Sequence, residues 1–175
     1  MELEEAIYKR RSIRQFTEAE VTKKELEMLV KAGIWAPTAG NIQPWLFFCI
    51  TEPEQIHNIQ VVSPGMLANP KALICVCSDL KRALDKAGEG GKTLALFDCA
   101  MAAQNIMLRA HDMGIGSCVI RSFNQAAVRT ILKAPSNIQP ELIIMLGRPA
   151  RVPKPPSRNE DVLFWEKYTE RGGGK

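Results

Sequence analysis

The stretch from Thr93 to Met113 limits the possible folds of this chain most, because it is predicted as one long helix with almost no polar face. Apolar side chains recur around most of its circumference, at Leu94, Phe97, Ala100, Met101, Ile106, Met107 and Leu108. A helix that is hydrophobic on all sides is buried. We therefore expect it at the centre of the fold or in a subunit interface.

Helices and strands alternate over the rest of the chain. Helical spacing of apolar residues predicts helices over Glu2–Lys9, Lys23–Trp35 and Pro53–Ile59, and another from a cap at Asn124 to Lys133. Short apolar runs predict buried strands over Leu46–Thr51, Lys71–Ser78, Ile115–Ile120 and Glu141–Leu146. Glu89–Lys92 is expected to be a loop.

Helix boundaries are marked by a few residues. Thr22-x-x-Glu25 is a capping box for the helix that begins at Lys23, and Pro37 stops that helix. Gly114 is expected to cap the long helix at its C-terminus. Alternating strands and helices by default suggest a doubly wound α/β domain. No Gly-x-Gly-x-x-Gly follows a strand, however, so a Rossmann dinucleotide site lacks its phosphate loop.

Size and composition exclude several classes of protein. The 175 residues are expected to form one domain over residues 1–170, followed by a disordered tail over 171–175. No apolar run approaches twenty residues, so no membrane span is expected. The acidic start Met1–Glu5 differs from a signal peptide and suggests a cytoplasmic protein. The net charge of +4 is too small to indicate nucleic acid but favours an anionic cofactor or substrate.

Cysteine and histidine indicate no metal site. Cys75 and Cys77 face the same side of a predicted strand, unlike a Cys-x-x-Cys pair. The other cysteines, Cys49, Cys99 and Cys118, also lie in apolar surroundings, so all five are expected in the core. Neither histidine, His57 or His111, has a cysteine or carboxylate partner at metal-ligand spacing.

A cluster of basic residues follows the first predicted helix. Arg10, Arg11, Ser12 and Arg14 lie within five residues of each other, bounded by Tyr8 and Phe16. Arginine forms bidentate contacts with phosphates and planar anions, and serine adds a short donor. Alternatively, the cluster is a solvated charge run or a nucleic-acid patch.

A second segment, Ala36–Trp45, is a loop of turn-forming residues that leads into a strand. Together the two segments resemble the FMN-dependent nitroreductase family, whose signature is Arg-x-Ser-x-Arg/Lys followed by Pro-Ser/Thr-x-x-Asn-x-Gln-Pro-Trp. Leu108–Ser117 and Ser157-Arg158 extend the resemblance over nearly the whole chain. The resemblance implies an α+β fold with a mainly antiparallel central sheet wrapped by helices. It also implies an intertwined homodimer with one FMN in each of two interfacial clefts.

The resemblance also assigns expected roles to the basic cluster. Arg10, Arg11 and Ser12 match residues that hold the FMN phosphate and ribityl chain. Arg14 matches the position whose cation reaches the flavin N1 and C2 oxygen. A fixed cation there stabilises the reduced flavin more than the oxidised one, because reduction leaves negative charge at N1.

The resemblance also assigns a role to the loop after the second predicted helix, for which an alternative stays open. Pro37, Thr38, Ala39 and Asn41 resemble a loop that reaches the flavin from the neighbouring subunit, and Gln43 helps to fix that loop. Turn chemistry alone explains Asn41 and Gln43 equally well.

Two further segments complete the implied site. Arg121 and Ser122 match a segment whose backbone amides face the flavin N5 and O4, although the family often has an acidic residue in place of Arg121. Lys154 and Arg158 resemble a phosphate-binding arm, for which a solvated basic tail is the alternative.

The function implied is a flavin oxidoreductase with a ping-pong cycle. NADH or NADPH delivers hydride to the flavin and leaves, and an electron-poor acceptor such as a nitroaromatic or a quinone takes its place. The cofactor carries this chemistry, so we expect no separate catalytic side chain. Two alternatives stay open: a relative with another flavin chemistry, such as reductive dehalogenation or flavin cleavage, and a phosphate or nucleic-acid binder without enzymatic turnover.

Overall fold

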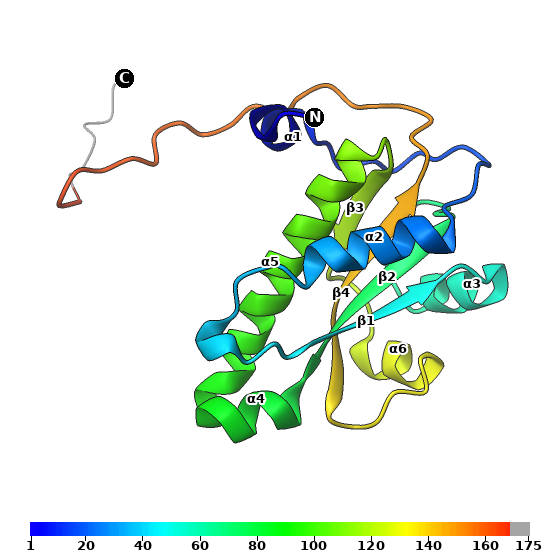
Figure 1. The fold of residues 1–175 in the computed structure, drawn as a ribbon. Coiled ribbons are helices and arrows are strands. Elements are labelled where there is room, and N and C mark those ends of the chain that lie inside the picture. The colour runs from blue at the N-terminus through cyan, green and yellow to red at the C-terminus, as the bar shows by residue number, and fades with distance from the viewer. Residues whose placement is uncertain (169–175) are drawn as a thin grey trace.

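The computed structural model describes residues 1–168 and has the α+β architecture that the resemblance implies (Figure 1). Four strands form one antiparallel sheet in the order β1-β2-β4-β3. Their bounds are β1 Trp45–Ile50, β2 Ala72–Asp79, β3 Gly116–Ile120 and β4 Ile138–Gly147. The helices are α1 Leu3–Lys9, α2 Lys23–Gly33, α3 Pro53–Val61, α4 Leu80–Ala87, α5 Gly91–Asp112 and α6 Gln125–Ile131. The tail predicted over 171–175 lies outside the described residues.

Helices cover both faces of the sheet. Ile74 and Val76 of β2 and Ile144 of β4 pack with α2 and α5, whereas Leu73 of β2 and Ile143 of β4 pack with α3 and α6. Successive residues of a strand point to opposite faces, so the two central strands must be apolar at nearly every position. This is why β2 and β4 are recognisable in the sequence as continuous apolar runs.

Helix α5 lies against the sheet and α2, as its apolar sequence predicts (Figure 1). Small residues such as Ala95, Ala102 and Ala103 are fully or almost fully buried, which allows close packing. Phe97 and Met101, however, expose 56% and 36% of their surface in the single chain. One stripe of this helix is therefore left without a cover.

Two elements differ from the sequence prediction. Helix α4 was not predicted, because the glycines at 88, 90 and 91 favoured the prediction of a loop. Asp79 caps this helix: its Oδ1 accepts a hydrogen bond from Arg82 N at 3.1 Å. Strand β4 begins before Pro140, which the ladder tolerates because the register shifts opposite it, between Val76 and Cys77.

The cysteine prediction holds for four residues and is wrong for Cys49. Cys75, Cys77, Cys99 and Cys118 are buried, and burial raises the pKa of the Cys75 thiol to about 12. Cys49 is exposed on β1, which is an edge strand of the sheet. Within residues 1–168 no cluster of ligand side chains suits a metal ion. No helix in the same range is long and apolar enough to cross a bilayer.

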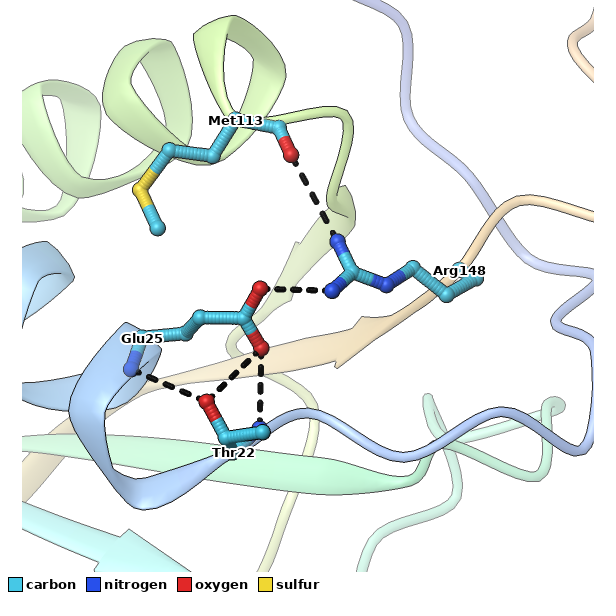
Figure 2. A network of polar contacts seen from close by, with 4 residues as sticks. All are labelled: Thr22, Glu25, Met113 and Arg148. Carbon is cyan, nitrogen blue, oxygen red and sulfur yellow. Dashed lines mark hydrogen bonds and ion pairs between the residues drawn. The ribbon is translucent and has the colours of Figure 1, made fainter.

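The predicted capping box joins three elements (Figure 2). Thr22 Oγ1 accepts a hydrogen bond from Glu25 N at 3.3 Å, and Glu25 Oε2 accepts one from Thr22 N at 2.9 Å. Glu25 Oε1 also pairs with Arg148 Nη2 at 2.5 Å, while Arg148 Nη1 donates to the Met113 carbonyl at 3.4 Å. The start of α2 is thereby tied to the end of β4 and the end of α5.

We expect Glu25→Gln to destabilise the protein by about 1 kcal/mol near neutral pH. Glutamine can still accept the hydrogen bond from Thr22 N, but it loses the charged partner of Arg148. The hydrogen bond from the Thr22 backbone, followed by Arg148, holds the pKa of Glu25 below its ordinary value. This stabilisation is complete above the unfolded pKa of about 4.3 and is lost as pH falls through the lowered folded value. Urea unfolding at about pH 6 and about pH 3 measures the difference.

Glu27→Gln is the matched control, because Glu27 is exposed on the same helix. Equal losses of stability in the two variants at both pH values would contradict this role of the Glu25 carboxylate.

Candidate functional site

The basic cluster lies on an extended segment that is held between β3 and the chain that follows β4. Ile13 N donates a hydrogen bond to the Ser117 carbonyl at 2.9 Å, and Ala150 N donates to the Gln15 carbonyl at 2.9 Å. Ile13 is 5% exposed and packs on Gly116, where a Cβ would lie 2.9 Å from Ile13 Cγ2. Only glycine allows this approach, which sets how closely the segment packs beside β3.

Two cavities border this segment. Arg10 and Arg11 line one of about 160 Å³, together with His111 and Ser117. Ser12 and Arg14 line another of about 200 Å³. Alternate residues of an extended chain point to opposite sides, which explains why Ser12 and Arg14 border one cavity while Ile13, between them, lines the other.

Charge distinguishes these two cavities from the rest of the surface. No carboxylate of residues 1–168 lines either of them. A larger cavity of about 580 Å³ lies elsewhere and is lined by Glu18, Glu20 and Glu52, so it would repel a phosphate. The smaller basic cavities are therefore the better candidates for an anionic ligand, despite their size.

The neighbouring guanidiniums of Arg10 and Arg11 have different partners. Arg11 Nη1 donates to the Tyr8 carbonyl at 2.7 Å and to the Arg10 carbonyl at 2.8 Å, and so caps the end of α1. The partly buried Arg10 side chain has no hydrogen bond or ion pair within residues 1–168. A partly buried cation without a counterion is suited to bind an anion.

The chain after β4 brings a different arginine to the site from those predicted. Arg151 lines the cavity of Ser12 and Arg14, whereas Lys154 and Arg158 are exposed and line neither basic cavity. Figure 1 shows the segment passing α1 and then running away from the domain. Arg151 lies in the same basic, proline-rich stretch, but its proximity to Arg14 depends on the pairing of Gln15 with Ala150. The roles of Lys154 and Arg158 stay predictions.

The loop after α2 is held by a buried carboxylate that sequence analysis missed. Asp98 of α5 is 1% exposed. Its Oδ2 accepts a hydrogen bond from Thr38 Oγ1 at 2.5 Å, and its Oδ1 accepts one from Ala39 N at 3.1 Å. Thr38 Oγ1 in turn accepts from Gln43 N at 3.0 Å. The only signal in the sequence is an acidic residue in the middle of the apolar run from Leu94 to Ala103.

The same loop adopts an uncommon backbone conformation. Gly40, Asn41 and Gln43 have φ values of 51°, 53° and 51°, in the left-handed region. Gln43 Nε2 donates to Asn41 Oδ1 at 2.6 Å, so the turn chemistry proposed for these two residues is present. Pro37 is exposed beside them. Strained loops of this kind persist only when their surroundings hold them, which here means Asp98.

Within one chain the loop and the arginines are far apart. The loop binds α5 at Asp98, near its start, while Arg10 and Arg11 share a cavity with His111, near its end. At a rise of about 1.5 Å per residue, these positions are separated by about 20 Å along the helix. Figure 1 shows the two segments at opposite ends of α5.

Arg121 and Ser122 follow β3 and are exposed. Arg121 Nη2 lies 3.5 Å from Oε2 of the buried Glu141, and its guanidinium lies 5.9 Å from the centre of the Phe123 ring. Glu141 Oε1 also accepts a hydrogen bond from Ser78 Oγ at 2.8 Å. The side chain of Arg121 is thus held against the sheet, and a flavin contact by its backbone stays a prediction.

The fold and the cavities define an α+β domain with a basic site suited to a phosphate-bearing ligand. This basic cradle consists of the two cavities lined by Arg10, Arg11, Ser12, Arg14 and Arg151. The chain belongs to the nitroreductase family: the sequence profile of that family matches residues 7–64 and 53–148. This confirms the resemblance drawn from the two motifs.

Three relatives illustrate the membership. A protein of Archaeoglobus fulgidus, provisionally named NADH dehydrogenase/NAD(P)H nitroreductase, is 34% identical over 82% of this chain and 83% of its own length. The FMN reductase (NADPH) of Bacillus subtilis is 28% identical over 93% of this chain and 72% of its own. The solved FMN-dependent nitroreductase of Clostridium difficile R20291 is 25% identical, with a TM-score of 0.82 over 95% of this chain and all of its own.

Proposed function

We propose that this protein is an FMN-dependent oxidoreductase that passes reducing equivalents from NADH or NADPH to electron-poor acceptors such as quinones or nitroaromatics. The observation that carries the proposal is the pair of basic cavities: within residues 1–168, Arg10 and Arg14 have no counterion and no carboxylate lines either cavity. The FMN in the names of the Bacillus and Clostridium relatives and the NADPH in the name of the Bacillus relative support the same choice.

The donor set fits the phosphate of FMN. Arg10 offers an unshared guanidinium, and Arg11 offers the N–H groups that its two bonds through Nη1 leave over. Ser12 offers a hydroxyl from the second cavity. Arg14, on the Ser12 side of the segment, would place positive charge beside the ring. When bound, FMN supplies the hydride chemistry, while the protein supplies binding, orientation and charge.

The proposal includes a homodimer, since one chain leaves the site incomplete. Phe97 and Met101 need a cover, and the Thr38–Gln43 loop lies about 20 Å from the arginines of its own chain along α5. In a two-fold dimer the loop of one protomer can approach the arginines of the other. The apolar core on each face of a single sheet supports one domain, and the free thiols fit a reducing compartment such as the cytoplasm.

Two half-reactions followed separately without oxygen test the proposal. We expect NADH or NADPH to bleach the visible absorption of FMN bound to the purified protein, and a quinone or nitroaromatic added afterwards to restore it. Bound FMN that neither nucleotide reduces would contradict the oxidoreductase assignment and leave a non-enzymatic phosphate binder.

Arg14→Gln should make the midpoint potential of the bound FMN more negative by roughly 30 mV. A cation about 4 Å from the developing charge interacts by roughly 4 kcal/mol at a dielectric near 20, and solvent at this exposed side chain reduces the benefit to about 1.5 kcal/mol. For two electrons this corresponds to about 30 mV. A dye-equilibrated redox titration measures the shift.

Arg14→Lys keeps the charge and should fall between the two proteins. Lys31→Gln removes one positive charge from the exposed end of α2 and should leave the potential unchanged. A potential in Arg14→Gln that is equal or more positive would remove Arg14 from the ring.

A further inference from the structure

His111 is a candidate ligand-binding residue that neither the sequence motifs nor the family profile assigns to the site. It lies in the last turn of α5 and lines the same cavity as Arg10 and Arg11. Its Nε2 is buried and has no hydrogen-bond partner within residues 1–168, where only Ser63 Oγ shares that condition. Buried polar atoms are nearly always paired, because an unpaired one costs free energy.

The groups around His111 leave an excess of positive charge. Arg10 and Arg11 face it from the segment after α1, while Glu5 faces it from α1 and Asp112 from α5. Both carboxylates already have cationic partners: Glu5 pairs with Lys9 at 2.7 Å, and Asp112 pairs with Arg109 and with the Met1 amino group. Arg10 has no such partner in the described chain.

This environment favours the neutral imidazole in the unliganded protein. Burial, followed by the guanidinium of Arg10, lowers the pKa of His111 from its ordinary value. A phosphate group in the cavity would reverse the sign of the field, since it brings about two negative charges next to two guanidiniums and the imidazole. The protonated ring has a donor on each nitrogen, and a phosphate oxygen would supply the acceptor that Nε2 lacks.

We propose that His111 is a further phosphate-binding residue of this cavity, and that it takes up a proton as the phosphate monoester of the ligand binds. The inference rests on the proposed FMN function. It adds a coupling between cofactor affinity and pH that Arg10, Arg11 and Ser12 cannot supply, because arginine keeps its charge and serine gains none.

The sign of the coupling follows from linkage. Binding raises the pKa of His111, so the additional affinity is complete below the unliganded pKa and disappears above the liganded one. Each unit by which the pKa rises is worth about tenfold in affinity. The FMN phosphate itself loses charge near pH 6, but this loss is common to the wild-type protein and its variants and cancels in their ratio.

The experiment measures the dissociation constants of FMN and riboflavin at about pH 6 and about pH 8 for the wild-type chain and His111→Gln. We expect His111→Gln to bind FMN roughly tenfold more weakly at the lower pH, with a difference near zero at the higher pH. Riboflavin should bind both proteins equally, because it lacks the phosphate. Calorimetry in two buffers of different ionisation enthalpy should show that the wild-type chain takes up more protons with FMN than His111→Gln does, because the proton released by the phosphate is common to both proteins.

Controls separate the possible outcomes. His57→Gln changes the other histidine, which is exposed on α3, and should match the wild-type chain. His111→Lys keeps a charge at all these pH values and should bind FMN tightly without the pH-dependent step. It also serves if the glutamine variant does not fold. Equal FMN affinity in His111→Gln at the lower pH, or equal losses for riboflavin, would overturn the inference alone. A wild-type chain that binds no FMN would overturn the proposed function with it.

Discussion

Arg10→Ala is expected to weaken FMN binding about 10- to 100-fold and to leave riboflavin binding nearly unchanged. A hydrogen bond to a charged group contributes about 1.5–3 kcal/mol, which converts to this range of affinities. The whole loss should fall on the phosphate, because the Arg10 guanidinium has no partner within the described residues whose removal would disturb the fold. Titration of the apoprotein with each ligand, followed by flavin fluorescence, measures both affinities.

Arg11→Ala is the comparison that makes this result specific. Arg11 caps the carbonyls at the end of α1, so its removal should also lower the stability of the apoprotein, by about 1 kcal/mol. We therefore expect Arg10→Ala to change affinity without stability, and Arg11→Ala to change both. Equal weakening of FMN and riboflavin by Arg10→Ala would place the phosphate elsewhere.

Asp98→Ala is expected to lower the free energy of unfolding by about 2–3 kcal/mol. The substitution removes an acceptor from two hydrogen bonds and leaves the Thr38 hydroxyl and the Ala39 N–H without their partner. Gly40, Asn41 and Gln43 would then lose the contact that holds them in the left-handed region, and FMN affinity should fall as well. Urea unfolding at equal protein concentrations measures the stability, since the stability of a dimer depends on concentration.

Conservative variants of the same contact distinguish a specific clamp from a general packing defect. Asp98→Asn keeps one carbonyl oxygen and should recover about half of the loss. Thr38→Ser keeps the hydroxyl and should resemble the wild-type chain, whereas Thr38→Val should resemble Asp98→Asn. If Asp98→Ala were as stable as the wild-type protein and bound FMN equally well, Asp98 would have no part in positioning the loop.

The elements that the sequence predicts well are those encoded by near neighbours. The capping box at Thr22 and Glu25 and the apolar runs of β2 and β4 depend on residues a few positions apart. Helix α4 has the spacing of an amphipathic helix at Leu80, Ala83, Leu84 and Ala87. It was missed because three glycines follow it closely. Local patterns therefore account for the sheet and most helices.

The site is less predictable because its details depend on contacts between distant residues. The motifs identify Arg10 and Arg11 together, but only the fold shows that Arg11 caps α1 while Arg10 faces the cavity without a partner in the described chain. The pairing of Asp98 with Thr38 and the approach of Arg151 to Arg14 likewise join segments far apart in the chain. The spacing of residues in the sequence does not predict these long-range contacts.

The central claim is that FMN binds in a site completed by two copies of the chain. Sedimentation velocity of the FMN-loaded protein, detected at the visible absorption band of the flavin, tests this most directly. The account predicts that all protein-bound flavin sediments as a dimer of the 19.5 kDa chain, with one FMN per chain. Flavin that sediments with a monomer, or a dimer that carries no flavin after incubation with excess FMN, would contradict it.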